Sequence, residues 1–202
     1  AYGLSEVADE VRPFAGGIAG RSRPGGWTNN VVNCGLSGPV DDREVDDLIG
    51  WYASRGIEPR IELCPFVDPS LIGALERTGF VLRTFESVFY RLLDPATPVI
   101  PVHPVPTAIA IRRIDRDDAT EVDRFARVAA SGSFPDDFDI PDHLLDISRR
   151  VAAHPKTAAF IAELDGEIVG AGACEVSGEI TALFGLSVLP GFRRRGIQQA
   201  LI

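Results

Sequence analysis

A tract dense in proline constrains the fold of this chain more than any other feature. It reads DPATPVIPVHPVPT over residues 94–107, with prolines at 95, 98, 101, 104 and 106. Proline lacks an N–H group and has a fixed φ, so neither a helix nor an interior strand can run through such a tract, which favours extended polyproline geometry. We therefore expect a linker over 95–107 that separates a module at 1–94 from a second module at 108–202.

The first module shows strand and helix patterns in alternation. They predict, in order, strand 29–36, helix 41–56, strand 59–66, helix 68–80 and strand 81–93. In the first helix the apolar residues recur at helical spacing, and Asp41 with Glu44 forms a capping box at its start. Gly56 suits the position just after its end. The pattern predicts an α/β module.

The second module has a different order of elements. The patterns predict strand 108–114, helix 117–132, helix 141–152, three strands at 157–166, 167–178 and 179–189, and a terminal helix after Gly196. Asp-Gly at 165–166 and Ser-Gly at 177–178 are the turn signals of an antiparallel meander. The run 182–189 is apolar on both faces, which predicts a central strand covered on each side. The whole chain is thus expected to be α/β (α+β).

Composition excludes several classes of function. The chain has 29 acidic and 20 basic residues, a net charge of -9, which argues against nucleic-acid binding and favours a cationic ligand. Its longest apolar run, 180–189, is about half of what a membrane-spanning helix needs, and the first residues carry no signal pattern, so we expect a cytoplasmic protein without a membrane partner. The three cysteines show no metal-ligand spacing, which favours reduced thiols and no metal site.

The 202-residue chain contains no methionine and stops inside a helical pattern. We take this as a hypothesis that the sequence is a fragment from which methionines have been left out, with further residues after Ile202. A native polypeptide of 21.8 kDa by intact mass would contradict it.

The stretch TALFGLSVLPGFRRRGIQQALI, residues 181–202, carries the strongest functional signal. Pro190 interrupts ladder pairing, and Gly196 lets an anion approach the main chain where a helix starts. Each of three consecutive arginines at the start of a helix destabilises the helix by about 0.3–1 kcal/mol, because its positive charge lies at the positive end of the helix dipole. A bound polyanion reverses this penalty. The alternative is a solvated basic turn paired with local carboxylates. Engagement of these arginine side chains by neighbouring aspartates, with no cleft beneath them, would favour that alternative.

The segment LSVLPGFRRRGIQQALI resembles the acetyl-CoA-binding segment of the GNAT superfamily of N-acetyltransferases, in which V-x-P is followed by [RQ]-x-x-G-x-[GA]. Val188, Pro190, Arg193 and Gly196 match this pattern, whereas Gln198 stands where a small residue is usual. The element order over 108–202 is similar to the first half of a GNAT domain, and 1–94 resembles a degenerate GNAT-like module. The resemblance implies a mixed, mostly antiparallel sheet flanked by helices.

The resemblance also implies a site for acetyl-CoA as co-substrate, without a metal. The backbone of the strand end would hold the pantetheine arm, and the following turn would wrap the diphosphate. The residues concerned are Leu186, Ser187, Val188, Arg193, Arg194, Arg195, Gly196, Ile197, Gln198 and Gln199. In this family the segment between the two helices, here 131–143, commonly forms a wall of the acceptor cleft; a solvent loop is the alternative.

The reaction implied is acetyl transfer to a primary amine of a small molecule or a protein, by direct attack on the thioester; a homodimer is compatible with it. No catalytic acid or base is assigned, because the tyrosines at 2, 52 and 90 lie away from the motif. The glutamates at 175 and 179 and the histidines at 103, 143 and 154 fit ordinary surface positions better. Two alternatives remain open: a non-catalytic acetyl-CoA or CoA-binding regulatory module, and an interaction module whose arginines meet an acidic partner.

Overall fold

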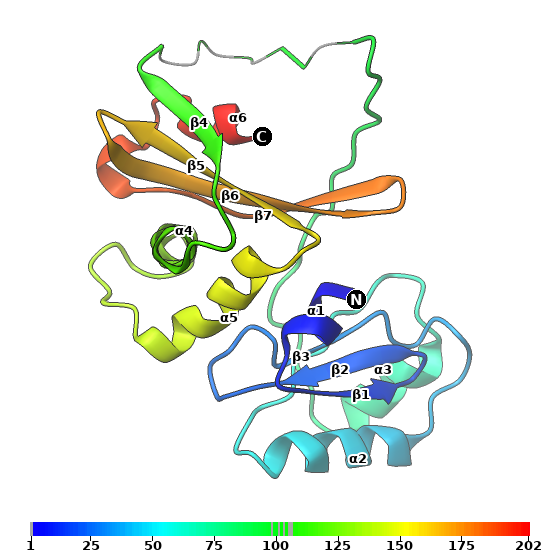
Figure 1. Ribbon diagram of the computed structural model, residues 1–202. Helices are drawn as coiled ribbons and strands as arrows, with labels where there is room; N and C mark the ends of the chain where they lie inside the picture. Colours follow the sequence, from blue (N-terminus) through cyan, green and yellow to red (C-terminus); the bar gives the residue numbers. More distant parts are fainter. Residues whose placement is uncertain (1, 98, 101, 103, 105–106) are drawn as a thin grey trace. The chain divides into compact units, whose positions relative to one another are not determined.

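The computed structural model describes residues 2–97, 99–100, 102, 104 and 107–202. The chain divides into two compact units, residues 1–91 and 92–202 (Figure 1). In the predicted linker, the described residues belong to no helix or strand, and the Asp94 carboxylate accepts a hydrogen bond from the Ala96 N–H at 2.9 Å. Pro98, Pro101, His103 and Pro106 lie outside the described residues.

The first unit is a small antiparallel sheet covered by helices. Its elements are α1 (Tyr2–Val7), β1 (Glu10–Phe14), β2 (Gly17–Arg21), β3 (Asn30–Val32), α2 (Asp42–Ala53) and α3 (Pro69–Arg77), and the sheet order is β1-β2-β3. Apolar residues of α2 and α3 fill the core together with the sheet. Tyr52 is fully buried there and donates its hydroxyl proton towards the Gly20 carbonyl oxygen, 2.7 Å away.

The two helices predicted in this unit are confirmed as α2 and α3, and both parts of the Asp41–Glu44 capping box are present. The strand predicted at 29–36 is confirmed only as the short β3. The hairpin of β1 and β2 was not predicted. It turns at Ala15 and Gly16, both with positive φ, and alanine is not a usual residue for such a turn.

Two strand predictions in the first unit are wrong. Residues 59–66 form no strand and contribute a single parallel bridge between Ile61 and Val31. Residues 81–93 form no strand either, and the side chain of Phe89 is 91% exposed. A β-strand needs a neighbour that completes its hydrogen-bond ladder, and an alternating apolar pattern does not reveal whether one is present.

The second unit follows the predicted order closely. It contains β4 (Ile109–Arg113), α4 (Ala119–Ser131), α5 (Asp142–Ala153), β5 (Thr157–Leu164), β6 (Glu167–Ser177), β7 (Ile180–Val188), a 3₁₀ turn (Pro190–Phe192) and α6 (Ile197–Leu201). All neighbouring strands pair antiparallel, in the order β4-β5-β6-β7. The predicted mixed α/β class, with antiparallel sheets flanked by helices, is therefore confirmed.

Helices cover both faces of this sheet, with α4 and α5 on one side and α6 on the other (Figure 1). Alternation along β5 explains the arrangement: Ile161 packs in the cluster with α4 and α5, and its neighbour Ala162 packs with α6. Glycine at 170 lets α6 lie close to the sheet, because a Cβ there would stand 3.1 Å from Cγ2 of Ile197. The Gly-Ala-Gly run in β6 is therefore a packing feature.

The prediction that residues 182–189 form a central strand is wrong. Strand β7 lies at the edge of the sheet and pairs with β6 alone among the residues that the structure describes. Five of its nine residues are exposed, including Ile180 at 72% and Leu183 at 56%. Apolar residues on both faces show only that a strand is hydrophobic. Whether the strand is central or at the edge depends on which other segments pair with it.

Candidate functional site

The last strand of the second unit contains a bulge. Ser187 pairs with Ala171 and Phe184 with Ala173, so that Gly185 and Leu186 together face the one residue between them on β6. Gly185 has φ +61°, a left-handed conformation that glycine adopts without strain. The bulge breaks the regular pleat immediately before the strand end and changes the direction in which the following backbone groups point.

At the end of β7, one backbone N–H group, that of Val188, faces the open edge of the sheet. The Leu189 N–H donates to the Val169 carbonyl oxygen at 2.9 Å, so it faces β6. Because backbone groups alternate in direction along an antiparallel pair, the N–H and carbonyl of Val188 face the opposite way. Pro190 has no N–H, and the register between β6 and β7 ends at Val188, as the sequence predicts.

A left-handed turn leads from the strand end into α6. Arg194 has φ +62° and Gly196 has φ +78°, and Ile197 is only 1% exposed because it packs on the sheet. Gly196 caps the helix without a side-chain hydrogen bond. In the part of the chain that the structure describes, no acceptor is found for the backbone N–H groups of Gly196, Ile197 and Gln198.

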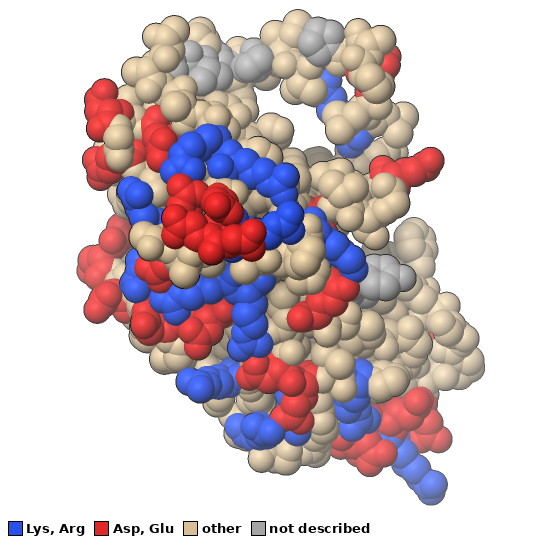
Figure 2. Space-filling model, in the orientation of Figure 1, with Lys and Arg blue, Asp and Glu red and all other residues tan. Residues whose placement is uncertain are grey.

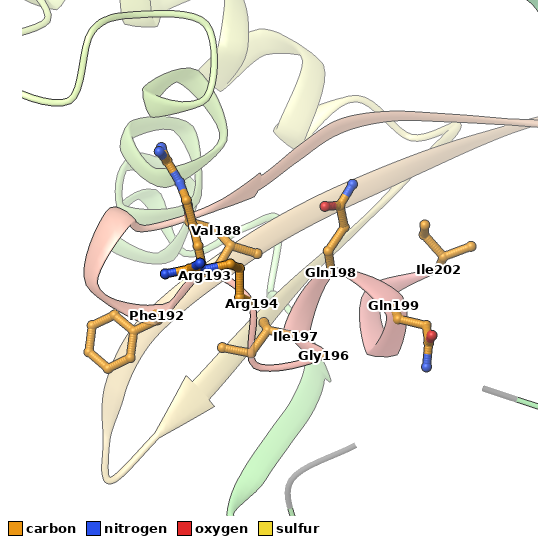
Figure 3. A pocket seen from close by; sticks show the side chains of 9 residues that line it. All are labelled: Val188, Phe192, Arg193, Arg194, Gly196, Ile197, Gln198, Gln199 and Ile202. Atoms are coloured by element: carbon orange, nitrogen blue, oxygen red, sulfur yellow. The ribbon is translucent and has the colours of Figure 1, made fainter. Parts of the chain in front are cut away.

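These segments enclose a cavity of about 460 Å³ (Figure 3). Seven of the ten predicted site residues line it, and Leu186, Ser187 and Arg195 do not. Two lining residues, Phe192 and Ile202, were not predicted. The full lining is Val188, Phe192, Arg193, Arg194, Gly196, Ile197, Gln198, Gln199 and Ile202. Ile202 lies four residues after Gln198, a spacing that places both on one side of a helix; no sequence signal marked Phe192.

The three arginines have different environments. Arg193 forms a two-pronged ion pair with Asp136, with contacts of 2.8 and 3.2 Å, and its Nε donates to the Val188 carbonyl oxygen at 3.1 Å. Arg195 donates to the Gly191 carbonyl oxygen at 3.1 Å. No hydrogen bond or ion pair joins the Arg194 side chain to another described residue.

The sequence left two interpretations of these arginines open. Among the described residues, pairing with a carboxylate is found for Arg193 and not for Arg194 or Arg195, and a cavity is present beside the turn. The Arg194 guanidinium and the neighbouring backbone N–H groups are thus donors without an acceptor in the described part of the chain. Such a set suits the oxygens of a phosphate or diphosphate.

The cavity contains no side chain suited to proton transfer in neutral solution. Tyr52 lies in the core of the first unit, where burial raises the pKa of its hydroxyl, and Tyr90 is exposed in the same unit. The side chain of Tyr2 lies outside the described residues.

The other candidate acids and bases occupy ordinary positions. Glu175 is half-buried at the end of β6, and Glu179 is exposed in the following turn. His143 is exposed, and Nδ1 of His154 accepts a hydrogen bond from the Lys156 N–H at 3.3 Å. Within the described part of the chain, no cluster of histidine, cysteine, aspartate or glutamate could hold a metal ion.

Comparison with protein families identifies the segment that builds this site. Residues 119–202, from the start of α4 to the end of the chain, match the model described as the acetyltransferase (GNAT) family. The similarity to this family thus covers 84 of the 202 residues. The GNAT segment thus contains the bulged strand, the turn and the cavity. A search of curated proteins finds no match.

Solved structures extend the similarity to the fold of the whole chain. A GCN5-related N-acetyltransferase from Kribbella flavida matches 99% of this chain and 73% of its own length, with a TM-score of 0.62 and 17% identity. At that identity the similarity shows the fold alone.

Two further structures match only part of the chain. An aminoglycoside acetyltransferase from an uncultured soil metagenomic sample is 22% identical, with coverage of 48% of this chain and 67% of its own and a TM-score of 0.37. An aminoglycoside 6'-N-acetyltransferase complexed with coenzyme A is 20% identical, with coverage of 46% and 50% and a TM-score of 0.37. The chain thus spans about half the length of the latter protein.

The surface charge agrees with the composition. Figure 2 shows basic and acidic side chains interspersed over the visible face, which therefore offers no continuous basic surface. None of the described helices is both long enough and apolar enough to cross a membrane.

Proposed function

We propose that this chain binds acetyl-CoA in the cavity beside Gly196 and transfers the acetyl group to a primary amine of a small molecule. One observation supports this most directly. Within the GNAT segment, the backbone N–H groups of the left-handed turn and the Arg194 guanidinium border one cavity and have no acceptor in the described chain. A diphosphate would supply the missing acceptors, and the net charge of -9 favours a cationic amine as the second substrate.

In this proposal each part of the site has a separate role. The turn and Arg194 bind the diphosphate, and the backbone of Leu186, Ser187 and Val188 holds the pantetheine arm along the open edge of β7. The cofactor supplies an activated acetyl thioester. The outward-facing N–H of Val188 would donate to the thioester oxygen and stabilise the negative charge that develops on it during attack.

The proposed reaction is a direct transfer. The neutral amine attacks the thioester carbonyl, a C–N bond forms, and the C–S bond breaks. The amine loses one proton and the departing CoA thiolate takes one up. No side chain is assigned to either proton transfer, because no tyrosine or histidine lines the cavity. That observation favours the second candidate function, a module that binds CoA without catalysis.

Calorimetric titration with CoA, acetyl-CoA and ADP tests the binding step. We expect Arg194→Glu to weaken CoA binding by at least about tenfold, since it places a like charge beside the diphosphate, while far-UV circular dichroism stays unchanged. Arg116→Glu is the matched control, because Arg116 is an exposed arginine of the same unit and does not line the cavity. Equal CoA affinity in the two variants would refute the proposed site.

A thiol-release assay separates the two candidate functions. Acetyl-CoA is incubated with the protein and a panel of small amines, and free CoA is followed over time. Amine-dependent CoA release by the wild type and its loss in Arg194→Glu are expected of an acetyltransferase. Tight CoA binding without release by any amine would favour the binding module.

A further inference from the structure

Arg193 is the arginine of the turn whose guanidinium forms an ion pair with a described carboxylate. Its Nη1 and Nη2 lie 3.2 and 2.8 Å from the two carboxylate oxygens of Asp136, and its Nε lies 3.1 Å from the Val188 carbonyl oxygen. The same side chain lines the cavity assigned to the diphosphate. The Nη groups that face Asp136 are also the donors that a guanidinium presents in paired fashion to phosphate oxygens.

Resting on the function proposed above, we propose that Asp136 is an internal competitor of the cofactor: its carboxylate occupies the Nη groups of Arg193 in the free protein, and the diphosphate takes them over on binding. A carboxylate and a phosphate offer the same pair of oxygens to a guanidinium, so the two cannot be bound through the same donors at once. Binding of the cofactor therefore breaks the contact with Asp136.

The ion pair is weak enough to be exchanged. The side chains of Arg193 and Asp136 are 44% and 54% exposed. Ion pairs with this exposure contribute little to stability, because water screens them and both side chains lose conformational freedom. A diphosphate carries more negative charge than one carboxylate and also contacts the backbone N–H groups of the turn, so it outcompetes Asp136.

The exchange has a consequence for the segment between α4 and α5. Backbone hydrogen bonds in residues 132–141 join close neighbours, such as the Phe138 N–H to the Pro135 carbonyl oxygen at 3.0 Å. Among the described residues, the contact of Asp136 with Arg193 is the one hydrogen-bonded link from residues 133–140 to a distant part of the chain. When the diphosphate displaces Asp136, this segment and the stacked pair Phe134 and Phe138 lose their polar attachment to the cofactor site.

Two variants with the same change in charge test the competition. Asp136→Asn removes the ion pair, whereas Asp137→Asn removes one negative charge from the adjacent exposed residue, which forms no ion pair with another described residue. By calorimetry, Asp136→Asn should bind CoA more tightly than the wild type by up to about fivefold, the fold-change that corresponds to the upper limit of about 1 kcal/mol for an exposed ion pair. Asp137→Asn should stay within about twofold of the wild type.

The other outcomes overturn the proposal in distinguishable ways. Equal tightening in both variants would mean that general charge repulsion, rather than competition for Arg193, is responsible. Weaker binding in Asp136→Asn would mean that Asp136 orients Arg193 for the cofactor. No CoA binding by the wild type would overturn the proposed function and the competition together, whereas wild-type binding without a gain in Asp136→Asn overturns the competition alone.

Hydrogen–deuterium exchange of the same variants gives an independent readout. In the wild type, CoA should speed amide exchange over residues 133–140. In Asp136→Asn the exchange there should already be fast without CoA, and CoA should add little. Unchanged or slower exchange of this segment in the CoA-bound wild type would contradict its release from Arg193.

Discussion

Gly185 provides a direct test of the bulge that shapes the site. It has φ +61°, and a Cβ added to it would have Ala129 Cβ as its nearest neighbour at 3.8 Å, an ordinary contact. Gly185→Ala therefore adds no steric clash, and its effect is conformational. An L-residue held in the left-handed region is destabilised by about 1–2 kcal/mol. For a unit of this size we expect the melting temperature to fall by roughly 5–10 °C.

The position of the tryptophans makes this measurement selective. Trp27 and Trp51 are the two tryptophans of the chain, and both lie in the first unit. Thermal unfolding followed by far-UV circular dichroism reports on both units, whereas tryptophan fluorescence reports on the first. In Gly185→Ala, the melting temperature of the second unit measured by circular dichroism should fall, whereas the melting temperature of the first unit measured by tryptophan fluorescence should not change.

Gly191→Ala is the matched control for this prediction. Gly191 lies in the 3₁₀ turn, does not have positive φ, and has no atom within 4 Å of an added Cβ. Its replacement should change the free energy of unfolding by less than about 0.5 kcal/mol. Acetyl-CoA affinity should fall in Gly185→Ala only, because flattening of the bulge would turn the Val188 N–H away from the thioester oxygen to which we propose it donates. Wild-type stability together with wild-type acetyl-CoA affinity in Gly185→Ala would refute the reasoning about the bulge.

Three further predictions concern stability and reactivity. Ile197→Ala should destabilise the second unit by about 2–4 kcal/mol in urea unfolding followed by circular dichroism, because its side chain is 1% exposed and holds α6 on the sheet. Hydrogen bonding from Arg149 lowers the pKa of Asp123 in the folded protein. The carboxylate of Asp123 therefore stabilises the fold above the ordinary aspartate pKa of about 3.9, and this stabilisation is lost as the pH falls through the lower folded-state pKa. In Asp123→Asn the free energy of unfolding should therefore decline less steeply at acid pH. Burial raises the pKa of Cys34 to about 11, whereas Cys64 is exposed. An aromatic disulfide reagent at pH 8 should therefore modify Cys64 quickly and Cys34 only after denaturation. Cys64→Ser should abolish the fast phase of this modification.

The features that the sequence predicted well depend on neighbours along the chain. The capping box of α2 joins residues three apart, and the α6 turn depends on the conformational freedom of Gly196. The order of strand, proline, arginines and glycine also lies within one short stretch, which is why the family resemblance and seven of the lining residues could be predicted.

Only the tertiary structure decided which segments meet. Among the described residues, it made β7 an edge strand, left residues 81–93 without a neighbouring strand, and brought Asp136 into contact with Arg193, 57 positions away in the sequence. Ladder hydrogen bonds and ion pairs of this kind join residues that no local pattern relates. The sequence by itself thus determined five of the six described α-helices, the turn chemistry and the resemblance of residues 119–202 to the GNAT acetyltransferase family. The packing determined which arginine is bound within the protein and which donors are left for a ligand.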